Sequence, residues 1–178
     1  MTAHADLLID NAGQLLTLAS PGGPKRGAAM RDLGPVAGGA VAVRDGRIVA
    51  VGPSAEVRRA AHAAKRIDAG GGTVMPGFVD PHTHLVWAGD RADEFEMRIA
   101  GASYMEIMAA GGGIMNTVRH TRAAGVDELA AQTRLRLDRM LAHGTTTVEI
   151  KTGYGLDVEG ELKQWQAIGR LRAETPAT

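Results

Sequence analysis

Two histidines separated by one residue follow an apolar run, and they are the residues of this chain best suited to chemistry. His82 and His84 come shortly after residues 74–79, which are Val-Met-Pro-Gly-Phe-Val. Because side chains alternate along a strand, a His-x-His pair at a strand end places two imidazoles on one face. Neutral imidazoles are frequent ligands of divalent metals. The pattern therefore predicts half of a metal site, against the alternative of two ordinary loop histidines.

The elements around this pair alternate between strands and helices. Residues 74–80 are almost all apolar, as expected for a parallel strand that is buried on both faces. Helical segments are predicted over residues 91–109, with an interruption at Gly101, and over residues 126–143. Residues 145–150 are mostly β-branched and predict a second strand. This order is typical of a β/α barrel.

A final helix is expected after the sequence Gly153-Tyr-Gly155. Asp157 is of the residue type that caps helix N-termini. The helical spacing of the apolar residues predicts that the buried face of this helix carries Val158, Leu162, Trp165 and Ile168.

The first seventy residues read as a small β-rich unit. Asp45-Gly46 separates two strand-like runs within residues 40–51 and is a strong signal for a hairpin with a type I′ turn. The other expected elements are two short strands around 11–13 within 6–19, a surface loop over 20–39, a helix within 54–65 and a strand at 65–68.

The chain is too short to complete the barrel that its second part begins. An eight-stranded β/α barrel takes roughly 250 residues, and this chain has 178 in all. We therefore expect an α/β protein with two parts: residues 1–72, the N-terminal part of a small β-sandwich domain, and residues 73–178, the first β/α units of an incomplete (β/α)8 metal-dependent hydrolase barrel. Two strands cannot close a barrel. The chain is then either the front of a longer protein or a fragment that needs a partner.

Composition excludes several other classes of protein. The formal net charge is zero, with 20 basic and 20 acidic residues, which argues against a nucleic-acid partner. There are no cysteines, so disulfides and thiolate metal sites are excluded. Neither a secretory signal nor an apolar stretch long enough for a bilayer is present, so we expect no membrane association and a cytoplasmic location.

Three segments of the sequence resemble the imidazolonepropionase family of the amidohydrolase superfamily. The first, Met75-Pro-Gly-Phe-Val-Asp-Pro-His-Thr-His-Leu85, is shared by many amidohydrolases. The other two are more specific to the family. They are Ser103-Tyr-Met-Glu-Ile107 with Ala110-Gly-Gly-Gly-Ile114, and His143-Gly-Thr-Thr-Thr-Val-Glu-Ile-Lys-Thr-Gly-Tyr-Gly-Leu156.

The resemblance implies a metal-dependent hydrolase of histidine degradation that converts 4-imidazolone-5-propanoate and water to N-formimidoyl-L-glutamate. It implies that His82 and His84 hold one divalent ion, Zn or Fe, with a further His and an Asp on later strands. Those later ligands and the acid/base residue are absent from this chain. Residues 1–178 alone are therefore expected to bind metal poorly and to be inactive. A homodimer is also a family expectation.

By the same resemblance, Arg91 and Tyr154 contact the substrate. An arginine in this place can pair bidentately with the propionate carboxylate. Without the family, Arg91 reads as a solvated residue of the charged run 90–96. Tyr154 follows the second strand, where a phenol flanked by glycines can reach a ligand. Tyr104 is a further candidate for the same pocket, or packs on a loop helix.

Other conspicuous residues carry no predicted role. The glycines at 111–113 lack the Lys-Ser/Thr sequel of a phosphate-binding loop and read as a turn or a flexible lid. Lys151 is assigned no metal role, because the resemblance implies a single ion. The remaining histidines are expected at the surface or, for the last of them, at the barrel end opposite the active site: His4, His62, His120 and His143.

Two alternatives stay open. The first is another amidohydrolase, such as an aminohydrolase of a purine, pyrimidine or triazine ring, which would not require a carboxylate partner for Arg91. The second is a non-catalytic remnant or one half of a split barrel, whose activity would appear only when the other half is added. The intact mass of the native protein distinguishes a longer enzyme from a complete chain of 18.6 kDa.

Overall fold

The computed structural model describes residues 3–20 and 22–178, which form two compact units. The first ends at Pro76 and the second runs from Gly77 to Thr178. This division lies four residues beyond the expected boundary between residues 72 and 73. The reason is that a short strand at Thr73–Val74 pairs within the first unit. Over the described residues, no helix has the length and apolar character needed to cross a membrane.

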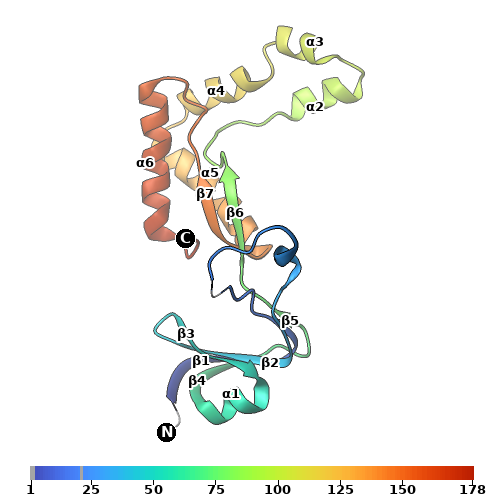
Figure 1. Cartoon of the computed structure of the whole chain (residues 1–178). Coiled ribbons are helices and arrows are strands. Elements are labelled where there is room, and N and C mark those ends of the chain that lie inside the picture. The colour runs from blue at the N-terminus through green and yellow to red at the C-terminus, as the bar shows by residue number, and fades with distance from the viewer. Residues whose placement is uncertain (1–2, 21) are drawn as a thin grey trace. The chain divides into compact units, whose positions relative to one another are not determined.

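The first unit is a mixed sheet with one helix. The strand order is β3-β2-β1-β4, and β5 also pairs with β1 (Figure 1). β1 is antiparallel to β2 and parallel to β4 and β5. The elements are β1 (Ala3–Leu16), a 3-10 turn η1 (Gly27–Arg31), β2 (Pro35–Arg44), β3 (Arg47–Pro53), α1 (Ser54–Ala60), β4 (Ala61–Asp68) and β5 (Thr73–Val74).

Of the two turns expected in this unit, the hairpin at Asp45-Gly46 is present and the break around residues 11–13 is not. Asp45 and Gly46 have positive φ angles of 51° and 69°, which confirms the hairpin between β2 and β3. The prediction of two strands around 11–13 was wrong, because the chain passes this point as one strand. Asn11 takes a positive φ of 57°, and the pairing with β2 shifts register between Ile9 and Ala12. A β-bulge thus replaces the expected break.

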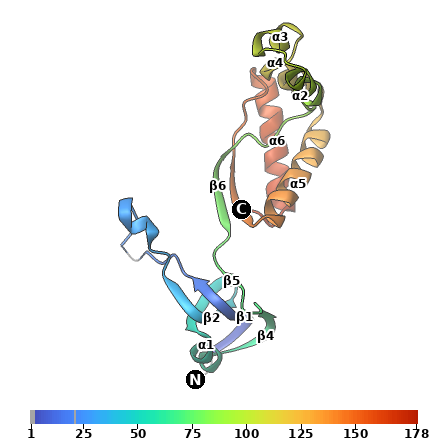
Figure 2. The same ribbon diagram turned by 90° about the vertical axis from the view of Figure 1, so that its right-hand side faces the viewer.

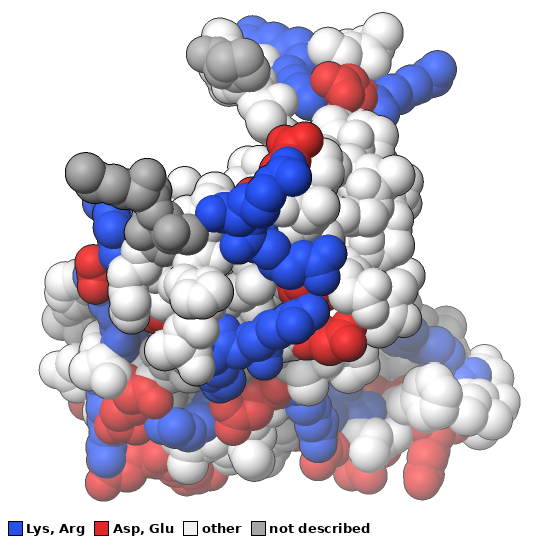
Figure 3. Space-filling model, turned by 90° about the horizontal axis from the view of Figure 1, so that it is seen from below, with Lys and Arg blue, Asp and Glu red and all other residues white. Residues whose placement is uncertain are grey.

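The expected loop at 20–39 is shorter than predicted, since it contains η1 and ends where β2 begins at Pro35. Within residues 40–51, the part in β2 lies inside the sheet and the part in β3 lies at the sheet edge. The face in Figure 3 carries both Lys and Arg and Asp and Glu.

A buried carboxylate, Asp10, lies in β1 of this unit. Its Oδ2 accepts from Arg66 Nη2 at 2.8 Å and from Arg58 Nη1 at 3.3 Å, and its Oδ1 accepts from the Asn11 amide at 2.7 Å. Burial alone raises the pKa of the Asp10 carboxyl. The Asn11 amide, the Ser54 hydroxyl and the two guanidinium groups outweigh burial and hold that pKa below its ordinary value.

Replacing Asp10 by asparagine is expected to lower the free energy of unfolding by about 1–3 kcal/mol, because two arginines lose their charged partner. The lowered folded-state pKa adds stability above the unfolded-state pKa of about 4, and this contribution is lost as the pH falls through the folded value. Denaturation of wild type and variant between pH 3 and pH 7 measures both effects. The exposed Glu56→Gln substitution is the control. Equal pH slopes for wild type and Asp10→Asn would contradict the prediction.

The second unit is a parallel strand pair covered by helices. β6 and β7 pair in parallel, and α5 and α6 pack together on one side of them (Figure 1, Figure 2). The helices predicted at 91–109, with their interruption at Gly101, and at 126–143 are confirmed. The elements are β6 (Phe78–Thr83), α2 (Ala92–Ile99), α3 (Tyr104–Ala109), α4 (Ile114–Ala123), α5 (Val126–Ala142), β7 (Thr145–Ile150) and α6 (Val158–Glu174).

The first strand of this unit differs from the prediction for residues 74–80 in extent and burial. Val74 belongs to β5, and β6 starts at Phe78 and continues through His82 to Thr83. Phe78 is 54% exposed and Val79 is 64% exposed, so the strand is not buried on both faces. Within the described residues β6 pairs with β7 alone, so the sheet is only two strands wide and the faces of β6 are incompletely covered.

The last helix begins as predicted but buries a different face. Asp157 caps it, with Oδ1 accepting from the Gly160 amide at 2.6 Å. Trp165 is 67% exposed and Val158 is 78% exposed. The expected apolar face is therefore wrong except at Ile168, which is partly buried against the core. The side of α6 that faces the core carries Gly160, Gln164, Ala167 and Leu171.

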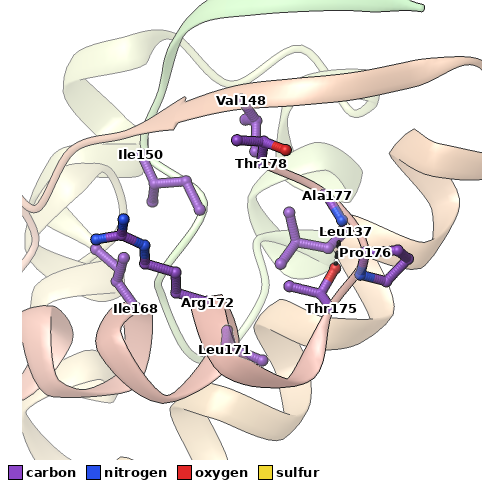
Figure 4. Close-up of a pocket in the computed structure, with 10 residues that line it drawn as sticks. All are labelled: Leu137, Val148, Ile150, Ile168, Leu171, Arg172, Thr175, Pro176, Ala177 and Thr178. Carbon is purple, nitrogen blue, oxygen red and sulfur yellow. Dashed lines mark hydrogen bonds between the residues drawn. The ribbon is translucent and has the colours of Figure 1, made fainter. Parts of the chain in front are cut away.

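The residues after α6 lie along the free side of β7. The Val148 amide donates to the Thr178 carbonyl at 2.9 Å, and the Thr178 amide donates to the Thr146 carbonyl at 3.0 Å. These two bonds form the pattern of a parallel bridge. Beside them is an apolar cavity of about 380 Å³ between β7, α6 and the terminal residues (Figure 4). Side chains of Val148, Ile150 and Leu171 line it.

Candidate functional site

The two histidines lie side by side at the end of β6. Their ring centroids are 5.5 Å apart, and the rings meet edge to face. Both residues are exposed. The pair is anchored by its neighbours, since the His82 amide donates to Asp80 Oδ1 at 3.2 Å and the Thr83 hydroxyl donates to the Glu149 carbonyl at 2.7 Å. Two adjacent imidazoles on a rigid strand are suited to share one metal ion.

The carboxyl ends of the two parallel strands meet at this point. Thr83 pairs with Ile150, and the Lys151 amide donates to the Thr83 carbonyl at 2.8 Å. The segment that follows β7 therefore passes directly beside His84. The Tyr154 ring lies edge to face with the His84 ring, at a centroid distance of 5.8 Å.

Gly153 leaves the space that the His84 ring occupies. A Cβ atom at position 153 would lie 2.9 Å from both Cε1 and Nδ1 of His84, a distance too short for any side chain. Its φ of 149° also disfavours other residues. The glycine before Tyr154 thus has a specific packing role beside the histidine pair.

Arg91 and Tyr154, the two residues for which the resemblance implies substrate contacts, line the same cavity. The cavity has a volume of about 390 Å³ and is also lined by Trp87, Asp90 and Thr117. Tyr154 joins this cavity to the histidine pair. The structure thus brings together a donor-rich cavity and two potential metal ligands at one end of the strand pair.

The guanidinium of Arg91 is held in a fixed orientation. Its Nε and Nη2 both donate to Thr117 Oγ1, at 3.1 and 3.0 Å. Glu94 Oε1 lies 4.0 Å from Nε. Burial raises the pKa of the Glu94 carboxyl, but the Gly113 amide, the Asn116 side chain and the charge of Arg91 lower it below its ordinary value. Nε and Nη2 of Arg91 are bonded to Thr117, and Nη1 has no hydrogen-bond partner among the described residues, so Nη1 can donate to an anionic group.

Sequence reasoning missed three residues that line the cavity. Trp87 follows His84 by three residues, and Asp90 directly precedes Arg91. Their nearness along the chain to predicted site residues was therefore a usable signal. Thr117 had no such signal, because it lies on α4, a helix that was not predicted.

The segment that carries Trp87 is held by α4 and α5. Arg136 Nη1 donates to the carbonyls of Leu85 and Trp87 at 3.0 and 2.9 Å, and its guanidinium carbon lies 3.5 Å from the Trp87 ring centroid. The Ala88 amide donates to the buried Thr121 hydroxyl at 3.1 Å. This chain segment is therefore fixed between the histidine pair and Arg91.

The remaining candidates lie apart from this cluster. Tyr104 is 61% exposed at the start of α3 and does not line the cavity. Lys151 forms an ion pair with Glu149 at 3.7 Å. The glycines at 111–113 form the turn into α4, with positive φ at Gly111 and Gly113. His4, His62, His120 and His143 are all exposed.

The possible metal donors in the described residues are too few for a complete metal site. Within the described ranges, 3–20 and 22–178, His, Cys, Asp and Glu nowhere gather in a group of three or more that could hold an ion. Two imidazoles supply half of the usual donor set, and catalytic metal sites commonly use three protein ligands. The geometry of His82 and His84 fits a shared ion, and further ligands would have to come from elsewhere.

Family models match two adjacent stretches of the chain. Residues 39–64 match an imidazolonepropionase-like composite domain of bacteria, and residues 65–123 match the amidohydrolase family.

Curated relatives are similar over nearly the whole chain. The imidazolonepropionase of Chloroflexus aggregans is 57% identical, and the alignment covers 96% of this chain and 40% of that protein. The imidazolonepropionase of Herpetosiphon aurantiacus is 58% identical, with 97% of this chain and 40% of that protein covered. The chain thus spans about two fifths of the length of the relatives that it matches.

Solved structures share the fold at low sequence identity. A zinc-bound adenosine deaminase from Xanthomonas campestris has a TM-score of 0.62 and 24% identity, over 96% of this chain and 33% of that one. A triazine hydrolase variant has a TM-score of 0.59 and 17% identity, over 94% of this chain and 34% of that one. The chain therefore has an α/β fold of the amidohydrolase kind and spans part of it.

Proposed function

We propose that the complete protein is an amidohydrolase of the imidazolonepropionase kind, which opens the ring of 4-imidazolone-5-propanoate. The reaction adds water across the ring amide C–N bond and yields N-formimidoyl-L-glutamate, a step of histidine degradation. The observation that carries the proposal is the cavity that joins Arg91 to Tyr154 beside the His82–His84 pair.

His82 and His84 would hold one divalent ion, with the remaining ligands supplied by residues outside this chain. Zn is supported by the zinc-bound deaminase of similar fold, and Fe is the alternative. When bound, such an ion supplies Lewis acidity toward water and toward a carbonyl oxygen. Residues 1–178 alone hold half of the donors, so we expect them to bind metal weakly and to be inactive.

Arg91 and Tyr154 would position the substrate in the cavity. The free Nη1 side of Arg91 can donate to the propionate carboxylate while Thr117 holds the Nε side. The Tyr154 phenol can donate to or accept from the ring. These contacts orient the reacting carbonyl toward the histidine pair and do not themselves break a bond.

The fold proposal follows from the same comparisons. Residues 77–178 would be the first β/α units of a (β/α)8 barrel, and the preceding residues would be part of a small β-sandwich domain. The parallel strand pair and the bonds of Thr178 to β7 support a barrel that continues with a third strand.

Purified complete protein should hydrolyse 4-imidazolone-5-propanoate in preference to ring aminohydrolase substrates such as adenosine or a triazine. The physical reason is that only the former offers a carboxylate to Arg91, a contact of about 1.5–3 kcal/mol or more than tenfold in kcat/KM. Product formation and ammonia release measure the two reactions. Faster ammonia release from a deaminase substrate would point to the aminohydrolase alternative. Activity that requires a second polypeptide would point to a split barrel.

A further inference from the structure

The loop that carries Tyr154 has an unusual backbone. Gly153 has a φ of 149° and Leu156 has a φ of 55°. A positive φ is uncommon for a residue such as leucine and requires support from its surroundings. The position of the Tyr154 side chain depends on the group that provides this support.

The support comes from one carboxylate on α6. Glu161 Oε1 accepts from the Gly155 amide and from the Leu156 amide, both at 2.8 Å. Gln164, which is fully buried one turn later, has its Oε1 3.4 Å from the Tyr154 amide. Three successive amides of the loop are thus directed at two side chains of the same helix.

The loop also lies very close to the helix backbone. A Cβ atom at position 155 would lie 2.4 Å from the Glu161 amide nitrogen and 2.5 Å from the carbonyl carbon of Gly160. Arg122 Nε donates to the Gly155 carbonyl at 2.6 Å from the other side. This packing limits the ways in which the loop can rearrange while Glu161 is in place.

Glu161 is suited to this role because it carries a negative charge. Burial raises the pKa of its carboxyl. The Thr152 hydroxyl and the Leu156, Gly155 and Gly153 amides outweigh burial and keep that pKa below its ordinary value. An ionised carboxylate accepts stronger hydrogen bonds from backbone amides than a neutral group does.

We propose that Glu161 is a positioning residue of the active site: it fixes the loop Gly153–Leu156 so that Tyr154 faces the cavity and Gly153 seats the His84 ring. The contacts that carry the inference are the two amide bonds to Glu161 and the close approach of Gly153 and Tyr154 to His84. The catalytic part of the inference rests on the proposed function, and the structural part does not.

Glu161→Ala in the complete protein is the test, with Glu159→Ala as the matched control. Glu159 lies on the same turn of α6 and is exposed, and its replacement by alanine removes the same charge as Glu161→Ala does. Glu161→Ala should lower kcat/KM for 4-imidazolone-5-propanoate about 10- to 100-fold, since small displacements of a substrate contact have effects of this order. Glu161→Gln keeps one acceptor oxygen and should recover most of the loss. Glu159→Ala should behave as wild type.

Two further measurements separate positioning from a general loss of structure. In a Tyr154→Phe background the effect of Glu161→Ala should shrink, because the two residues act as one unit. Amide hydrogen exchange at Gly155 and Leu156 should accelerate in Glu161→Ala and not in Glu159→Ala. If Glu161→Ala does not fold, Glu161→Asp replaces it, since the shorter carboxylate keeps the charge but not the reach.

The possible outcomes are distinct. Equal exchange rates in the two alanine variants, or fast exchange with unchanged kcat/KM, would overturn the role of Glu161. A wild-type protein that does not hydrolyse the substrate would refute the proposed function. In that event the exchange rates still decide whether Glu161 holds the loop.

Discussion

Replacing His84 by alanine in the complete protein is expected to remove most of the bound metal and to lower kcat/KM about a thousandfold. The imidazole is one of two that lie side by side at the end of β6, 5.5 Å apart between centroids. With one donor removed, the affinity of the ion falls, and several kcal/mol of charge stabilisation are lost with it. A loss of that size corresponds to roughly three orders of magnitude in rate. Metal content by elemental analysis and steady-state kinetics measure the two effects.

The matched control is His143→Ala. His143 is exposed and follows α5, two residues before the start of β7, so it lies at the other end of the strand from the site. This variant should keep wild-type metal content and activity. Full metal occupancy in His84→Ala would show that His84 is not a ligand, and an equal loss in both variants would point to unfolding instead.

The sequence was most informative where one residue type has one structural meaning. Asp45-Gly46 adopts the positive φ angles of a tight hairpin, and Asp157 caps α6 as expected. His82, in β6, and His84, one residue beyond its end, lie side by side as the alternation of side chains along an extended chain predicts. These features depend on a few neighbouring residues, so local reasoning suffices.

The sequence was misleading where a close approach between distant segments decides the outcome. On α6 the hydrophobic pattern selected the face of Trp165, which is 67% exposed. The face that is buried carries Gly160, which lets the Tyr154 loop approach, and Gln164, which lies beside the Tyr154 amide. Neither requirement is visible from apolar spacing. For the same reason Thr117 could not be linked to Arg91, since 26 residues separate them.

Arg91→Lys is expected to raise KM for 4-imidazolone-5-propanoate about 10- to 100-fold with little change in kcat. Lysine keeps the positive charge but loses the planar fork, and it cannot bond to Thr117 and to a carboxylate in the geometry that Arg91 allows. A hydrogen bond to a charged group contributes about 1.5–3 kcal/mol, which sets the size of the effect. A rise in KM alone is the signature of lost binding that is shared by ground state and transition state.

A substrate analogue makes this prediction specific to the carboxylate. If the propionate is converted to its amide, wild type should lose the advantage over Arg91→Lys, because the group that Arg91 distinguishes is gone. Arg98→Lys, on the last turn of α2, the helix that Arg91 precedes, is the control for the substitution itself. An Arg91→Lys penalty that persists in full with the amide would mean that Arg91 acts through Glu94 and Thr117 on the shape of the cavity, and the substrate carboxylate would then need another partner.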